Sequence, residues 1–97
     1  MIVGISSFEL HLPDSRSLKD KRRVVRSLID RLYHLHRVSI AETGFQDLHQ
    51  RAEISLAAVT NGQTEMDQLL ENVRQLVETV PEVYLTRWEP QILEESH

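Results

Sequence analysis

Cysteine is absent from this chain of 97 residues. Its absence excludes disulfide bonds, thiolate nucleophiles and cysteine-based zinc sites. The opening residues, MIVGISSFEL, lack the positive start and the long apolar run of a signal peptide. Elsewhere, no stretch approaches the roughly 18 consecutive apolar residues that a membrane-spanning helix needs. These absences favour a cytoplasmic protein with no membrane partner.

Glycine and aromatic residues are also scarce. The three glycines, Gly4, Gly44 and Gly62, lie far apart, so the chain has neither a P-loop nor a G-x-G-x-x-G nucleotide cradle. The G-x-x-G loop of a KH domain is missing as well. Aromatic residues make up 5% of the chain, and the strands expected at the centre of a sheet offer only Phe8, on the core side. The sequence therefore lacks the base-stacking platform of an RRM domain.

No pattern in the sequence indicates a metal site or a catalytic site. His34 and His36 are two residues apart, so a helix points them to different sides. His11 and His49 could meet in the fold, but no third ligand accompanies them. We therefore expect no metal, no cofactor and no catalytic residue, and we favour a non-enzymatic protein over an enzyme.

Hydrophobic periodicity predicts six secondary-structure elements in one domain over residues 1–97. Alternating apolar residues indicate strands, and apolar spacings of three and four indicate helices. Asn61-Gly62 is read as the entry to the second helix, Pro81 stops that helix, and Pro90 favours an edge position for the last strand. The predicted elements are a strand at 2–12, a helix at 18–35, strands at 38–43 and 51–60, a helix between Gly62 and Pro81, and a strand at 82–93, before a frayed tail at 94–97.

The order β-α-β-β-α-β, with one apolar stripe on each helix, predicts the fold class. A four-stranded antiparallel sheet with both helices on one face buries every stripe at once. Right-handed crossovers then favour a ferredoxin-like α+β sandwich. The strands at 2–12 and 51–60 have the most apolar runs, so we expect them at the centre of the sheet.

Charge is unevenly distributed along the chain. The net charge is -4, yet residues 16–37 contain eight of the 11 Lys and Arg residues and only two acids. Ser17 is expected to cap the helix that begins there, with Asp20 as its capping-box partner. On a helical wheel, Lys21 lies nearer the apolar side, where we expect its stem to snorkel along the core surface and its ammonium group to reach water.

The other cations of this helix form one column with a neighbour, namely Lys19, Arg23 and Arg26 with Arg22 beside them. The column could be a solvated helix face with Asp30 as the i+4 partner of Arg26, or it could pair with the acidic second helix. The helix macrodipole disfavours cations at this end, so helix stability does not explain them. We therefore favour a polyanionic partner that the column contacts through phosphates.

The segment GFQDLHQRA (44–52) joins two predicted strands and is dense in hydrogen-bonding groups. A recognition loop would use the side chains of Gln46, Asp47, Gln50 and Arg51. Gly44 permits a positive φ in this segment. A structured hairpin is the alternative, in which Asp47 caps local amides and Arg51 pairs with an acid. In that alternative, Phe45 and Leu48 fill the core.

Three segments resemble the YlxP-like family of small, uncharacterised bacterial proteins: ELHLP (9–13), SLKDKRRV (17–24) and ETGFQDLHQRAE (42–53). The resemblance covers essentially the whole chain. It implies a ferredoxin-like α/β sandwich with no known catalytic assignment. In some bacteria the gene of this family lies among translation and ribosome-maturation genes, which implies an RNA or ribosome context.

The sequence thus favours a non-enzymatic protein that binds structured RNA or the ribosome, with Lys19, Arg22, Arg23 and Arg26 on phosphates. A homo-oligomeric regulatory or scaffold domain, assembled through an edge strand or the open sheet face, is one alternative. Val3 and Ile5 share the parity of the outer sheet face with polar residues, which predicts a homodimer contact there.

A small acylphosphatase-like hydrolase is the other alternative. Acylphosphatases share this order of strands and helices, and they hold a phosphate with an arginine in the first strand-to-helix loop. Arg16 lies in that loop here. However, the loop PDSRS has no glycine to wrap a phosphate, and Asp14 would repel one.

Overall fold

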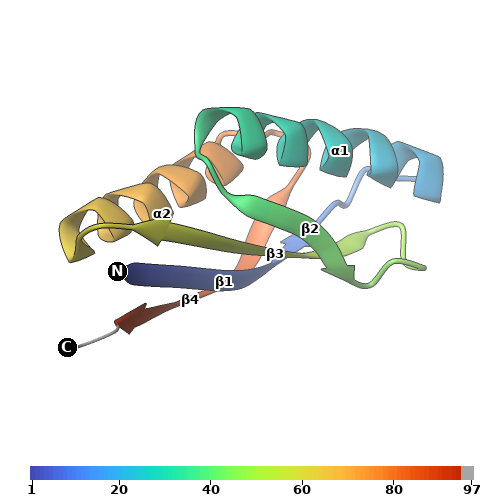
Figure 1. The fold of residues 1–97 in the computed structure, drawn as a ribbon. Helices are drawn as coiled ribbons and strands as arrows, with labels where there is room; N and C mark the ends of the chain where they lie inside the picture. Colours follow the sequence, from blue (N-terminus) through green and yellow to red (C-terminus); the bar gives the residue numbers. More distant parts are fainter. Residues whose placement is uncertain (95–97) are drawn as a thin grey trace.

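The computed structural model describes residues 1–94, and its elements follow the predicted order (Figure 1). The first helix and the third strand have the predicted bounds, and the other boundaries differ by a few residues. Glu94 ends the last strand, and the rest of the expected frayed tail lies outside the described residues. The elements are β1 (Ile2–His11), α1 (Leu18–Leu35), β2 (Ser39–Gly44), β3 (Arg51–Thr60), α2 (Gln63–Glu78) and β4 (Tyr84–Glu94).

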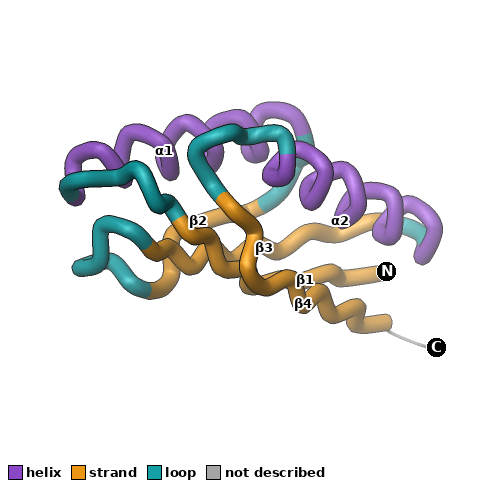
Figure 2. Tube along the Cα trace, turned by 180° about the vertical axis from the view of Figure 1, so that it is seen from behind, coloured by secondary structure: helices purple, strands orange, loops and turns teal. Residues whose placement is uncertain are grey.

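The sheet has the order β2-β3-β1-β4, and all its pairings are antiparallel. Both helices cover the same face, and the opposite face is left open (Figures 1 and 2). The arrangement is the predicted ferredoxin-like sandwich, with β1 and β3 at the centre. Pro90 lies on the edge strand β4, which pairs with β1 on one side only. Proline has no N–H to donate, and an edge strand tolerates this because it has no partner strand on its other side. No helix of residues 1–94 is long and apolar enough to span a membrane.

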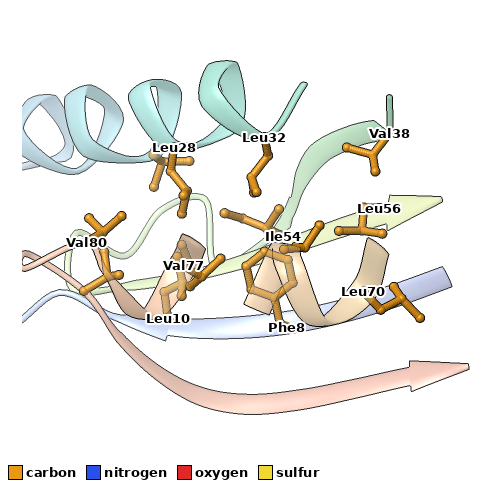
Figure 3. Packing of buried hydrophobic residues seen from close by; sticks show 14 of the residues in the cluster. Phe8, Leu10, Leu28, Leu32, Val38, Ile54, Leu56, Leu70, Val77 and Val80 are labelled. Carbon is orange, nitrogen blue, oxygen red and sulfur yellow. The ribbon is translucent and has the colours of Figure 1, made fainter. Parts of the chain in front are cut away.

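The core lies between the helices and the covered face of the sheet (Figure 3). Strict alternation along β1 and β3 directs Phe8, Leu10 and Ile54 inward, where they meet Leu28 and other apolar residues of the helices. Gly4 also faces inward, and a Cβ atom there would collide with the Met66 sulfur. The glycine in a central strand is therefore a place where α2 approaches the sheet closely.

The N-terminus of α1 is capped as the sequence predicts. The Ser17 hydroxyl accepts a hydrogen bond from the Asp20 amide at 3.1 Å. The Asp20 carboxylate in turn accepts one from the amide of Arg16 at 3.0 Å, one residue before the cap. These bonds satisfy N–H groups that the first helical turn leaves without partners. In α2 the cap is Gly62, which has no side chain to offer.

Candidate nucleic-acid interface on helix α1

The side of α1 that points away from the sheet carries the cation column predicted from the sequence. We name as the basic face the four exposed residues Lys19, Arg22, Arg23 and Arg26, which together with Asp20 line a shallow hollow. Their outward direction follows from helical periodicity, because Val24, Val25, Leu28 and Leu32 occupy the buried side of the same helix. The basic face is therefore accessible along the first two turns of α1.

None of these four cations forms an ion pair within 4.0 Å in the described part of the chain. In particular, the expected pair between Arg26 and Asp30 is not formed. Arg74, the cation of α2, binds Glu78 of its own helix, with Nε 2.8 Å from Oε1. That hydrogen bond and the charge of Glu78 raise the pKa of Arg74. Among residues 1–94 no ion pair joins the two helices, so interhelical pairing does not account for the basic face.

Lys21 belongs to the same run of cations but lies on the inner side of α1. Its side chain is 1% exposed, and its Nζ atom lies 3.0 Å from Oε2 of Glu42. The ammonium group also donates hydrogen bonds to the carbonyl oxygens of Phe45, at 2.7 Å, and Arg51, at 3.0 Å. The prediction that this ammonium reaches water is wrong, because the side chain is buried and the ammonium binds two carbonyl oxygens and forms an ion pair with Glu42.

The residue with a positive φ in the connection between β2 and β3 is not the glycine. Phe45, and not Gly44, has a positive φ, of 57°. The guanidinium of Arg51 lies over the Phe45 ring, 3.9 Å from its centroid, and its Nη2 atom lies 3.2 Å from Oε2 of Glu9. The cation–π contact and the ion pair hold Arg51 in place. The predicted pairing of Arg51 with an acid is therefore present.

Gln50 is also used within the fold. Its Nε2 donates to the carbonyl oxygens of Pro13 and Ser15, at 3.2 and 3.3 Å, and its own carbonyl accepts from the amide of Leu12. Gln50 thus fastens the β2–β3 connection to the β1–α1 connection.

The remaining loop residues are exposed. Gln46 donates to the carbonyl of Glu42, and Asp47 makes no side-chain hydrogen bond within residues 1–94, so its predicted capping role is not observed. Leu48 is 46% exposed and does not fill the core. All four loop residues predicted for recognition are exposed. In the described part of the chain, Gln46 bonds only within the loop and its strand, whereas Gln50 and Arg51 bind other segments of the fold.

The start of α1 and the β2–β3 connection lie at the same end of the molecule (Figure 1). Lys21 joins them directly, since it anchors α1 to residues on both sides of the loop. The structure therefore brings the basic face and the predicted recognition loop to one end, although they come from separate segments. The sequence gives no signal for this junction beyond the position of Lys21 on the apolar side of the wheel.

A second cluster of charges, which sequence reasoning missed, lies on the open face of the sheet. Glu9 pairs with Arg51 and lies 3.7 Å from Nη2 of Arg87, which is 3.6 Å from Oε2 of Glu53. Thr43 donates to Glu53 at 2.6 Å. The cluster spans all four strands because their register sets Glu9 beside both Glu53 and Arg87. Only the strand parity of these residues could be predicted from sequence.

No group of three or more His, Asp or Glu side chains in residues 1–94 is placed to hold a metal ion. His11 does lie beside the β2–β3 connection, where its Nδ1 is 3.2 Å from the carbonyl oxygen of Gln50.

Two solved structures share the fold. One is the crystal structure of a "putative antibiotic biosynthesis monooxygenase" from Deinococcus radiodurans, with a TM-score of 0.59 and 15% identity over 100% of this chain and 94% of that chain. The other is a "putative chlorite dismutase", with a TM-score of 0.51 and 11% identity over 95% of this chain and 44% of that chain. At such identities the likeness shows the fold alone.

Sequence comparison identifies the family. Residues 3–89 match the family described as "Protein of unknown function (DUF503)". The Bacillus subtilis (strain 168) protein described as "Uncharacterized protein YlxP" is 32% identical over 85 residues, which span 88% of this chain and 92% of that protein. The resemblance to YlxP-like proteins is confirmed, and the chain belongs to the DUF503 family.

Proposed function

We propose that the protein is a cytoplasmic, non-enzymatic binding protein that attaches to structured RNA, as a free RNA or within the ribosome, through the basic face of α1. The observation that carries the proposal is the lack of any ion-pair partner for Lys19, Arg22, Arg23 and Arg26 within residues 1–94. Unpaired cations keep their full attraction for phosphates, and their contacts release condensed counterions from the nucleic acid.

The electrostatic setting supports a ligand. The chain is acidic overall, with a net charge of -4, so the basic face is a local exception. Lys19 lies in the first turn of α1, where the positive end of the helix macrodipole makes a cation unfavourable by a few tenths of a kcal/mol to about 1 kcal/mol, and the other three cations follow within the next two turns. A face that costs stability and pairs with nothing else in the fold is explained by a partner that supplies negative charge.

The geometry favours a structured RNA over a flexible single strand. From Lys19 to Arg26 the helix rises by roughly 10 Å, so successive side chains can reach neighbouring phosphates of one strand. The basic face has no aromatic member, whereas binders of single strands combine cations with stacking platforms. Backbone contacts to a folded RNA require no stacking. The exposed Gln46 and Asp47, at the same end of the molecule, would then help to set orientation.

The test is the salt dependence of binding to a structured ribosomal RNA fragment. Changing Lys19, Arg22 and Arg23 to Gln removes three phosphate contacts, so the slope of log K against log salt should fall by roughly 2–3 units. The matched control changes Arg31, Arg37 and Arg74 to Gln, which alters net charge by the same amount. Arg31 lies on another side of α1, Arg37 beyond its end and Arg74 on α2.

The control variant should retain a slope close to that of the unmodified protein. Equal losses in the two variants would indicate a general charge effect and contradict a defined basic face. Comigration of the native protein with ribosomal particles at low salt, and its release at high salt, would place the RNA in the ribosome. A triple variant that unfolds more easily but binds as before would overturn the proposal.

A further inference from the structure

The face of the sheet opposite the helices is uncovered over its whole area (Figure 1). Outward-facing residues of neighbouring strands form rows across this open face. The row at the end nearest the N-terminus is apolar, because Val3 is paired with Val59 on one side and Leu93 on the other. Val59 is 65% exposed and Leu93 55% exposed. In the next row Ile5 lies beside Ala57. An apolar surface is thus exposed on two successive rows.

Further along the strands the open face becomes polar but has no unpaired cation in the described residues. Ser7 and Ser55 share a hydrogen bond of 2.8 Å, and Ser55 bonds Thr43 at 2.7 Å. Beyond this hydroxyl row, Arg51 and Arg87 are both held by carboxylates. The open face therefore offers little attraction to a polyanion, unlike the basic face on the other side of the molecule.

We propose that the open face binds the open face of a second copy of this chain, and that Ile5 lies near the two-fold axis. With the axis at Ile5, the apolar row of Val3 meets the hydroxyl row of Ser7 from the partner. The charged cluster then lies at the rim, with its charges already neutralised in pairs. The exception is Glu89 of the edge strand β4, a carboxylate beside Ser7 that forms no ion pair within residues 1–94. Otherwise apolar and neutral groups lie at the centre and charges at the rim, which is the usual anatomy of an interface.

The size of the open face fits a dimer. β1 and β3 have ten residues each, β4 has 11 and β2 has six. With strands spaced by about 4.8 Å and residues by about 3.3 Å, they cover roughly 600 Å² on one copy. Two such faces bury roughly 1,200 Å², the lower bound for stable protein interfaces. Only a contact over most of the sheet reaches that area. The expected dimer is therefore one of moderate affinity, with a dissociation constant on the order of micromolar.

Sedimentation equilibrium tests the mass. The unmodified protein should pass from monomer to dimer as its concentration crosses the micromolar range. Ile5→Lys places two like charges face to face near the axis, so it should weaken association at least roughly tenfold. Leu35→Lys is the control, because Leu35 is 63% exposed on α1, away from the open face. A protein that stays monomeric throughout, or an Ile5→Lys variant that associates normally, would overturn the proposal.

Cross-linking tests which face forms the dimer contact. The chain has no cysteine, so a single introduced thiol can react only with the same thiol of another copy. Ala57→Cys introduces one thiol beside Ile5, close to the proposed axis, so a mild oxidant should join two copies efficiently. Ser27→Cys introduces an equally small thiol on the exposed side of α1 and should cross-link only by random collision. A dimer in which Ser27→Cys cross-links and Ala57→Cys does not would show that another surface associates.

Discussion

Lys21 and the basic face lie on opposite sides of the same two turns of α1. They come from one run of cations, but one is buried and bound within the fold and the others are exposed. Lys21 is buried and bound by one carboxylate and two carbonyl oxygens. Lys19, Arg22, Arg23 and Arg26 point outward and have no ion-pair partner in the described chain. Helical periodicity alone decides which side each residue takes.

The two sides of α1 differ in what a cation there contributes, which is stability of the fold on the inner side and charge for a ligand on the outer side. A buried cation stabilises a fold only when its acceptors are complete, and its loss leaves them unsatisfied. An exposed cation without a partner contributes little to stability, and its charge is available to a ligand. Arg51 and Arg87 on the open face form an intermediate case, because they are partly exposed but held by Glu9 and Glu53. Substitutions that remove one charge at a time should therefore reduce stability most at Lys21, less at Arg87 and least on the basic face.

The largest effect is expected for Lys21→Met, which keeps an unbranched apolar stem of the same length and removes the ammonium group. It leaves the Glu42 carboxylate and two carbonyl oxygens without their donor. Removing one partner of a buried ion pair typically costs 3–5 kcal/mol. We expect about 3 kcal/mol here: Oε2 of Glu42 is buried, but the side chain is 22% exposed, so the stranded carboxylate can turn toward water and recover part of the loss. Urea denaturation measures the change in free energy of unfolding.

Two further variants make this result specific. Lys19→Met removes an exposed cation two residues away and should change stability by no more than about 0.5 kcal/mol. Adding Glu42→Gln to the Lys21→Met variant removes the stranded carboxylate, so part of the lost stability should return. Equal losses for Lys19→Met and Lys21→Met would contradict the assignment of Lys21 as the anchor of the β2–β3 connection.

Most of the fold could be predicted from the sequence because its signals are periodic. The bounds of α1 followed from Ser17 as cap and from an apolar stripe with clear ends. The bounds of the strand predicted at 38–43 are shifted in the structure, where no residue of β2 is fully buried. The structure shifts it to Ser39–Gly44, with an irregularity in its pairing between Glu42 and Gly44. A strand in which few side chains are buried has no strong period to mark its ends.

The candidate site was predictable only in part, for the same physical reason. The outward direction of Lys19, Arg22, Arg23 and Arg26 follows from the helical period, and the structure agrees with it. The roles of Gln50 and Arg51 depend on contacts with residues about 35 and 42 positions away in the sequence. The local sequence pattern does not indicate such partners, so it could not show that the fold itself uses these two side chains.

A smaller effect is expected for Arg87→Gln, compared with the same change at Arg23. Arg87 lies between Glu9 and Glu53, which face each other directly across β1 and β3. Without it, the two carboxylates repel each other, so the free energy of unfolding should fall by about 1 kcal/mol at low salt. Arg23→Gln should change stability by less than half as much. A similar loss at Arg23 would imply a partner for the basic face within the protein.

The smallest effect, and one of opposite sign, is expected for Lys19→Glu. Position 19 is in the first turn of α1, after the Ser17 cap, where the macrodipole favours an acid over a base. A glutamate there also precedes Arg23 by four residues, the favourable order for a helical ion pair. We expect the free energy of unfolding to rise by roughly 0.5–1 kcal/mol at about 10 mM ionic strength and by much less near 1 M. Arg37→Glu makes the same change in net charge beyond the C-terminus of α1, where a cation is favoured, so it should give no gain. If Lys19→Glu stabilises the fold while weakening attachment to RNA, the basic face is kept at a cost in stability for the sake of binding. A loss of stability at Lys19→Glu would instead show that the cations of α1 serve the fold on both sides of the helix.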